Sequence, residues 1–287
     1  MYDAITSITR RLRTSGTMFT LVLASILAVT TVSCAQECGR TSFSPTPNYA
    51  MQMIVGGQVA NEGDFPWQVG LLENGILIGG GTYVVGAGGV VKVITAAHVL
   101  YGKEPFVNNY QVVFGMHNTH GGGTKRIVQA VNIKVHESYN QNNITHDIAV
   151  IGFGNLMPSA LPVNTFPACR PTRTYTHNEY AVVSGWGSTS EDGSASTVLH
   201  YVWKPLISLA ACEQTGNAGL LDSSMLCGGA AGKDACSGDS GGPLVAPRNG
   251  AWEVVGLVSW AFGCGRANFP GVYSDVWALR SWLNNNL

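Results

Sequence analysis

The sequence predicts an all-β protein. Its 287 residues include 36 glycines and only 11% charged residues, and no long stretch repeats apolar residues with the 3.6-residue period of a helix. Short apolar or alternating runs follow one another instead, separated by Gly, Asn, Ser and Pro, which is typical of short strands joined by turns. A chain of this length can bury a sizeable core, as one domain or as two closely packed halves.

Two sets of runs are expected to form the strands. The first set covers residues 67–72, 76–85, 90–94, 110–114, 127–135 and 148–153. After a link near residues 155–175, the second set covers residues 180–184, 198–207, 243–246, 252–260 and 271–276. Six runs, a link and five or six more suggest two closed antiparallel sheets. Residues 248–250 favour a hairpin turn, and residues 276–283 have the apolar spacing of one short amphipathic helix.

The N-terminal region predicts export of the chain. Residues 19–32 form an apolar run that is too short for a comfortable membrane span. Arg10, Arg11 and Arg13 precede this run, and small residues follow it. We therefore expect a secretory signal peptide over residues 1–35 and a secreted, extracellular protein.

The segment 232–243, GKDACSGDSGGP, contains the most informative residues. A serine hydroxyl becomes a useful nucleophile only with a base beside it and with donors aimed at the developing oxyanion. The small residues around Ser240 would allow a tight turn that presents its hydroxyl group. The spacing Gly-x-Ser-x-Gly also fits the nucleophile elbow of α/β-hydrolases, so this segment alone leaves two kinds of hydrolase open.

The order of residues along the chain decides between these two kinds. An α/β-hydrolase carries its histidine after the serine, whereas all seven histidines here precede Ser240. The base must therefore come from upstream, in the order His, Asp, Ser. Two segments offer these groups: TAAH ends an apolar run with His98, and DIAV opens another with Asp147.

TAAH, DIAV and GDSGGP together resemble the chymotrypsin-fold (S1 family) serine proteases, and the similarity extends from Ile54 to the C-terminus. The resemblance implies two antiparallel six-stranded Greek-key β-barrels with the active site between them, and a short C-terminal helix. His98 would be the general base to Ser240, and Asp147 would fix the tautomer of the imidazole. The N–H groups of Gly238 and Ser240 would form the oxyanion hole. The implied activity is that of a serine endopeptidase that forms an acyl-enzyme and needs no cofactor.

The resemblance also implies a zymogen. Residues 36–53 would be a propeptide, and residues 54–287 would be the peptidase domain. Cleavage before Ile54 would free an ammonium group that pairs with Asp239 and orders the oxyanion loop. The bond follows Met53, where the family usually has Arg or Lys, so either a protease that accepts Met activates the chain or its processing differs.

Substrate specificity is expected to depend on Asp234. In the family this position lies at the base of the primary pocket, where a carboxylate selects Arg or Lys through a charge-assisted pair. Ser259, Trp260, Ala261 and Gly271 would form the walls, with Ala261 in place of the Gly usual in trypsins. Chymotrypsin- or elastase-like specificity is one alternative. A catalytically silent, protease-like binding protein is another, although such proteins usually lack a triad residue and this chain has all three.

The cysteines agree with export. Their number is seven, and loss of Cys34 with the signal peptide leaves six, which suits a secreted protein. Sequence alone permits fifteen pairings of six cysteines. The resemblance implies the pairs Cys38–Cys169, Cys212–Cys227 and Cys236–Cys264.

Charge and the remaining motifs bear on ligands and partners. A net charge of −1 gives no basic footprint for nucleic acid. His117 and His120 lie in a Gly-rich loop, and residues 110–135 contain no Asp or Glu, so we expect no bound metal, calcium included. Asn143 begins the one N-glycosylation sequon. We expect a monomer whose partners are protein or peptide substrates, an activating protease and protease inhibitors, with no membrane contact after signal cleavage.

Overall fold

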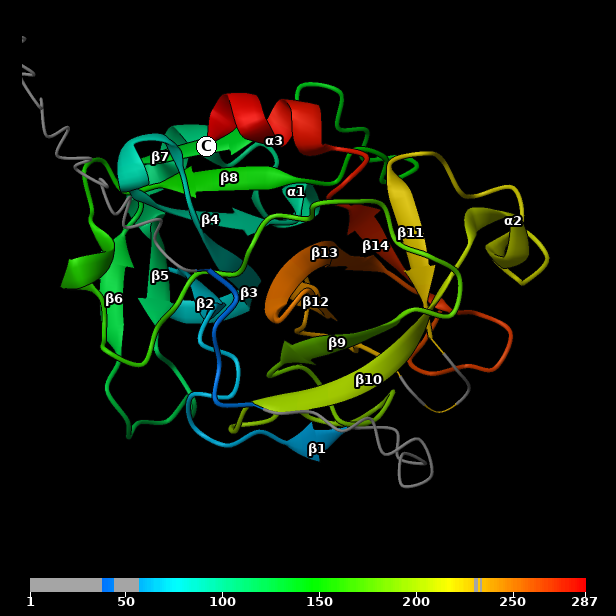
Figure 1. Cartoon of the computed structure of the whole chain (residues 1–287), viewed down its shortest axis with the longest axis horizontal. Coiled ribbons are helices and arrows are strands. Elements are labelled where there is room, and N and C mark those ends of the chain that lie inside the picture. Colours follow the sequence, from blue (N-terminus) through cyan, green and yellow to red (C-terminus); the bar gives the residue numbers. More distant parts are fainter. Residues whose placement is uncertain (1–37, 44–56, 230–231, 233) are drawn as a thin grey trace, which may run out of the picture. The chain divides into compact units, whose positions relative to one another are not determined.

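The computed structural model describes residues 38–43, 57–229, 232 and 234–287. The predicted signal peptide, the bond before Ile54 and most of the predicted propeptide lie outside these residues. Within them, nearly all regular structure is antiparallel sheet (Figure 1). The description below covers this part of the chain.

The first sheet has the order β6-β5-β2-β3-β4-β8-β7. Its strands are β2 (Gln68–Glu73), β3 (Ile76–Val85), β4 (Val91–Thr95), β5 (Tyr110–Phe114), β6 (Arg126–Gln129), β7 (Asn132–Val135) and β8 (Ala149–Gly152). The two end strands are successive parts of one predicted run, in which β6 pairs with β5 and β7 pairs with β8. At the bend between them, the N–H of Ala130 donates to Tyr110 and the N–H of Val131 donates to Gly152. This run therefore borders both β5 and β8, which curls the sheet.

The second sheet closes into a six-stranded barrel, because β9 pairs with both β10 and β12. Its strands are β9 (Tyr180–Gly185), β10 (His200–Ile207), β11 (Met225–Gly228), β12 (Pro243–Arg248), β13 (Ala251–Trp260) and β14 (Gly271–Asp275), and β1 (Gln58–Val59) adds to the edge of β10. The all-β, two-barrel prediction is confirmed. The sequence does not predict β1 or β11, because each is too short to show an alternating pattern.

Short helices connect and flank the sheets. They are α1 (Ala97–Leu100), α2 (Leu209–Cys212) and α3 (Arg280–Asn286), with 3-10 turns η1 (Ala87–Gly89), η2 (Glu104–Asn109) and η3 (Pro158–Ala160). The C-terminal helix begins later than residue 276, where the sequence predicts it, because the Asp275 carboxylate accepts the N–H groups of Trp277 and Ala278 at 2.9 and 3.0 Å and holds a turn there. No helix in the described ranges is long and apolar enough to cross a membrane.

Three disulfides join distant segments. They are Cys38–Cys169, Cys212–Cys227 and Cys236–Cys264, with Cα–Cα distances of 4.9, 6.4 and 5.3 Å. These are the three pairs that the resemblance implies. The first ties the described part of the predicted propeptide to the link between the sheets, and the third lies close to Ser240 in the chain.

Candidate active site

Strand pairing in the first sheet brings His98 to Asp147. His98 follows the end of β4 in α1, and Asp147 precedes β8. The antiparallel register places Thr95 opposite Ala149, so the end of β4 meets the beginning of β8. As a result His98 Nδ1 lies 2.8 Å from Asp147 Oδ2, and the N–H of His98 donates to Oδ1 at 2.7 Å.

The second barrel also holds Asp147. Ser259 Oγ, on β13, donates to Asp147 Oδ2 at 2.5 Å, and Ser274 Oγ, on β14, donates to the Asp147 carbonyl. The Asp147 side chain is 1% exposed, whereas that of His98 is 26% exposed. The carboxylate is thus fixed from both barrels, and the imidazole beyond it still reaches solvent. Sequence reasoning assigned Ser259 only to a pocket wall and missed this contact.

Ser240 lies on a loop that packs against the same end of the first sheet. Its carbonyl accepts the N–H of Gly80 at 2.9 Å. Gly241 has a φ of +74°, and a Cβ there would lie 2.0 Å from Thr95 Oγ1, so only glycine permits this approach to β4. Within the described residues no hydrogen bond joins Ser240 to His98. Contacts between a nucleophile and its base are often long when no substrate is bound and shorten in the complex.

Gly238 and Ser240 supply the two backbone N–H groups that the resemblance assigns to the oxyanion hole. Gly238 has a φ of +102°, a conformation that favours glycine. Neither the N–H of Gly238 nor that of Ser240 donates to another residue in the described ranges. Both groups remain available to a ligand oxygen.

The Asp239 carboxylate points the other way, toward β9. Its Oδ1 accepts the N–H of Gly187 at 2.7 Å, and its Oδ2 accepts the N–H of Cys236 at 3.0 Å. A Cβ on Gly185 would lie 2.0 Å from Oδ1, so the carboxylate occupies space that only glycine leaves. Burial raises the pKa of the Asp239 carboxyl, although these two N–H groups lower it. Asp239 and Gly187 line a small pocket, and Gly57 lies on its wall as well.

A cavity of about 230 Å³ opens beside Ser240. Its lining includes all the residues that the resemblance assigns to substrate binding: Asp234, Ser259, Trp260, Ala261 and Gly271. Gly271 does more than form a wall, since a Cβ there would lie 2.5 Å from Asp234 Oδ1. The Asp234 carboxylate, where it lies in this structure, therefore requires a glycine at position 271.

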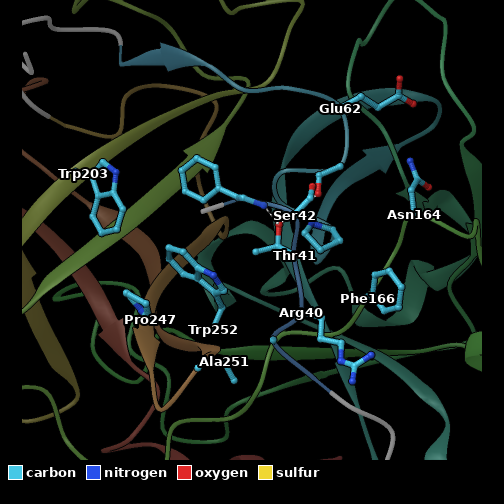
Figure 2. Close-up of a pocket in the computed structure, with 15 residues that line it drawn as sticks. Arg40, Thr41, Ser42, Glu62, Asn164, Phe166, Trp203, Pro247, Ala251 and Trp252 are labelled. Carbon is cyan, nitrogen blue, oxygen red and sulfur yellow. Dashed lines mark hydrogen bonds between the residues drawn. The ribbon is translucent and has the colours of Figure 1, made fainter. Parts of the chain in front are cut away.

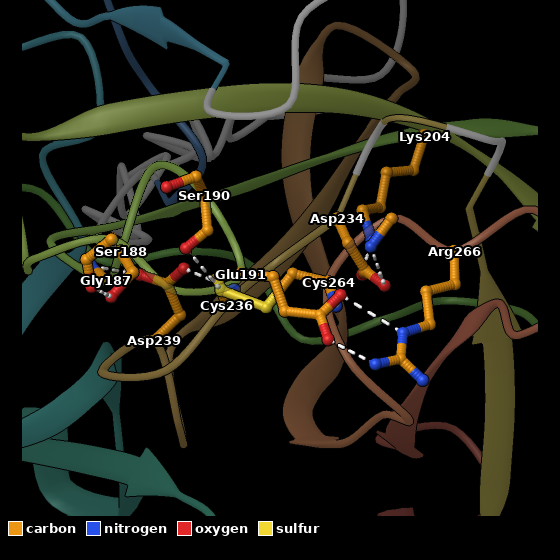
Figure 3. The surroundings of a disulfide bond; sticks show 12 residues. Gly187, Ser188, Ser190, Glu191, Lys204, Asp234, Cys236, Asp239, Cys264 and Arg266 are labelled. Atoms are coloured by element: carbon orange, nitrogen blue, oxygen red, sulfur yellow. Dashed lines mark hydrogen bonds and ion pairs between the residues drawn. A yellow bond between two sulfur atoms is a disulfide. The ribbon is translucent and has the colours of Figure 1, made fainter.

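Asp234, which lines this pocket, forms an ion pair that sequence reasoning missed. Lys204 Nζ donates to Asp234 Oδ1, and the two side chains are 0% and 3% exposed (Figure 3). Burial lowers the pKa of Lys204, while the adjacent Asp234 raises it. Lys204 lies on the same face of β10 as the buried Val202 and Leu206, so a lysine in an apolar series was the only sequence signal.

A second ion pair lies at the edge of the pocket. Glu191, which lines the pocket, accepts from Arg266 Nε at 3.1 Å and from Arg266 Nη2. Figure 3 shows this pair near the disulfide between Cys236 and Cys264. Both side chains are exposed, at 37% and 54%, so the pair contributes little to stability. Sequence reasoning did not single out either residue.

A larger hollow lies elsewhere, around the described part of the predicted propeptide (Figure 2). It measures about 920 Å³, and its lining includes residues 39–43, Trp203 and Trp252. Phe43 packs on Phe65 and on Trp252 with ring centroids 5.0 and 5.8 Å apart. None of the candidate site residues lines this hollow, so we assign it to the attachment of residues 38–43.

The absence of a structural metal remains a prediction. The described residues contain no group of three or more His, Cys, Asp or Glu side chains that could hold a metal ion. We therefore expect excess chelator to leave the thermal midpoint unchanged in a melting experiment followed by circular dichroism. A fall of more than about 2 °C, equivalent to about 1 kcal/mol for a domain of this size, would contradict the prediction.

Comparisons with known proteins agree with this geometry. The family model for trypsin matches residues 54–283. The chain is 37% identical to trypsin beta of Drosophila erecta, over 81% of this chain and 88% of that protein. It is 36% identical to trypsin alpha-4 of Lucilia cuprina, over 80% and 86% of the two chains, and 34% identical to trypsin-1 of Astacus astacus, over 81% and 99%. With the two-barrel fold, these matches show that the chain belongs to the trypsin family and is a serine-type endopeptidase that acts on proteins or peptides.

Proposed function

We propose that this protein is made as a secreted zymogen and, once activated, hydrolyses peptide bonds through an acyl-enzyme on Ser240. The observation that carries the proposal is the contact between His98 Nδ1 and the buried Asp147, at 2.8 Å, with Ser240 on the adjoining loop. A histidine held this way keeps its Nδ1 protonated and leaves Nε2 free to accept a proton.

The proposed mechanism assigns each group one step. Ser240 Oγ attacks the scissile carbonyl while His98 Nε2 takes its proton, and the resulting oxyanion accepts the N–H groups of Gly238 and Ser240. The imidazolium, stabilised by Asp147, then gives its proton to the leaving amine. Water attacks the acyl-enzyme by the same route in reverse, which releases the acid and restores the hydroxyl.

A covalent label tests this assignment. A sulfonyl fluoride should modify Ser240 of the activated chain and abolish peptide hydrolysis, and mass spectrometry would locate the adduct. The His98→Gln variant is the control, because its hydroxyl lacks a base and should react far more slowly. A catalytically silent binding protein would show neither labelling nor hydrolysis.

Activation is proposed to occur between Met53 and Ile54, with residues 1–35 removed as a signal peptide and residues 36–53 acting as the propeptide of the 54–287 domain. Gly57 supports this step, because it lines the pocket that contains the Asp239 carboxylate. Three residues of chain span about 10 Å, enough for the Ile54 ammonium to enter that pocket. The carboxylate forms no ion pair with another described residue, so the ammonium would supply its partner. Three disulfides favour a secreted location.

The activated enzyme should lose activity in alkaline solution. Pairing with Asp239 raises the pKa of the Ile54 amine above the usual α-amino value of about 8. The pair is therefore fully formed below about pH 8 and is lost as the pH rises through the raised pKa. The value of kcat/KM, measured between pH 7 and 11, should fall together with the rate of Ser240 labelling. A profile that stays flat to about pH 11 would exclude this pair.

Two specificities are candidates. Cleavage after Arg or Lys is supported by the position of Asp234 at the base of the pocket and by the trypsins among the relatives. Cleavage after uncharged residues, as in chymotrypsin- or elastase-like enzymes, is favoured by the ion pair between Asp234 and Lys204. The two candidates differ in whether the Asp234 carboxylate is available to a substrate.

The proposed partners are an activating protease that accepts Met, protein inhibitors of proteases and protein substrates, with the enzyme itself a monomer. Asn143 is exposed, in the loop before Asp147, so a glycan there is part of the proposal. Treatment with a glycosidase, followed by mass measurement, would detect it.

A further inference from the structure

We propose that Lys204 neutralises the negative charge of Asp234 in the primary pocket and thereby directs this enzyme to peptide bonds that follow uncharged residues. The inference rests on the proposed function, because it concerns the substrate of the Ser240 site. Lys204 does not line the pocket. It acts through Asp234 and is therefore a positioning residue.

Lys204 is enclosed by the second barrel. Its side chain is 0% exposed, and on β10 it lies between the buried residues Val202 and Leu206. Its Nζ bonds Asp234 and lies 5.3 Å from the centre of the Tyr273 ring. A buried ammonium needs a partner within reach. Among the described residues, Asp234 is the only carboxylate that forms a hydrogen bond with Lys204 Nζ. The lysine therefore cannot release Asp234 without a large cost.

Asp234 in turn has little capacity left for a substrate. One carboxylate oxygen accepts from Lys204, and the other accepts the N–H of Gly265 at 3.3 Å. The side chain is only 3% exposed. A substrate guanidinium or ammonium that entered the pocket would lose its hydration and meet a carboxylate that is already paired, with a second positive charge behind it.

Among the described residues, the rest of the lining offers no unpaired carboxylate. Glu191 is the other carboxylate on the wall, and it is paired with Arg266. The remaining lining includes Val258, Trp260, Ala261 and Val272. These groups favour an uncharged side chain of moderate size.

Burial lowers the pKa of Lys204, and the negative charge of Asp239, like that of Asp234, partly offsets this lowering. A role limited to compensating the buried Asp239 carboxylate would be structural, and its loss would weaken hydrolysis of every substrate alike. A role in specificity changes the ratio between charged and uncharged substrates. The test must therefore measure the ratio of kcat/KM values.

The experiment uses the full chain, activated by limited treatment with immobilised chymotrypsin and shown by N-terminal sequencing to begin at Ile54. Peptides that differ only in the residue before the scissile bond (Arg, Lys, Leu, Phe or Ala) supply the kcat/KM values. We expect the wild type to prefer an uncharged residue over Arg and Lys by at least about tenfold. Lys204→Met, which keeps the side-chain length, should raise the ratio of charged to uncharged cleavage by about 100-fold or more, because it frees a buried carboxylate. Benzamidine, a small amidinium, should inhibit this variant far more strongly than the wild type.

The matched control is the double variant Lys204→Met/Asp234→Asn, which removes both charges of the ion pair. Its kcat/KM for Arg and Lys peptides, relative to uncharged peptides, should stay at the wild-type ratio. A wild type that prefers Arg or Lys overturns the inference without any variant, so the test survives if Lys204→Met fails to fold. An unchanged ratio in a folded Lys204→Met enzyme overturns it as well. Cleavage after Arg leaves the proposed function intact, whereas an activated chain that cleaves no peptide and takes no sulfonyl label refutes the proposed function itself.

Discussion

Replacing Ser240 by alanine should lower kcat for peptide hydrolysis by about 10⁶-fold, the loss seen when a catalytic serine is removed from a triad. The variant lacks the hydroxyl group that is proposed to form the acyl-enzyme, while the backbone N–H groups of Gly238 and residue 240 remain. Residual hydrolysis would therefore come from water activated within the oxyanion hole. The measurement is steady-state peptide hydrolysis, together with the melting temperature of the variant.

Ser223→Ala is the control for this prediction. Ser223 is exposed and its side chain has no hydrogen-bond partner among the described residues, so both activity and melting temperature should stay near wild type. The Ser240 variant should melt close to wild type too, since its hydroxyl makes no hydrogen bond in the described structure. If Ser240→Ala kept more than about 1% of the activity, another nucleophile would have to be sought.

The fold could largely be predicted from the sequence because most strands are long enough to show their pattern. Runs such as 76–85 and 252–260 exceed the length at which alternation becomes visible. The sequence did not predict β11, because Met225–Gly228 is short and entirely buried and so shows no alternation of apolar and polar residues. The start of α3 was misplaced because the Asp275 carboxylate bonds two successive N–H groups and delays the helix, a competition between side chain and backbone that apolar spacing does not report.

The candidate site was predictable to the extent that its groups sit in distinctive local segments. His98 ends the motif TAAH, Asp147 opens DIAV and Ser240 lies within GDSGGP. Lys204 lies in no such motif, and its contact with Asp234 depends on the direction in which β10 faces and on the path of a loop thirty positions later in the chain. A contact of this kind follows from strand register within the barrel. Spacing along the sequence could not reveal it.

Replacing Asp147 by asparagine should lower kcat by about 10⁴-fold, the magnitude known for the corresponding change in this protease family. The hydrogen bonds explain why. The backbone N–H of His98 donates to Oδ1, so the amide oxygen of the variant must take that place. The amide NH₂ then faces His98 Nδ1 and donates to it, which moves the imidazole proton to Nε2. An Nε2 that carries a proton cannot accept one from Ser240.

The Asp147→Asn prediction has a matched control in Glu104→Gln, which also turns a carboxylate into an amide. The Glu104 side chain has no hydrogen-bond partner among the described residues, so its variant should stay within about twofold of wild-type activity. The rate of sulfonyl labelling should follow kcat in both variants, because both report proton removal from Ser240. The contact of Ser259 with Oδ2 adds a second expectation: its hydroxyl must turn from donor to acceptor, which perturbs the site without unfolding it. A loss below about tenfold would mean that the buried carboxylate does not set the tautomer of His98.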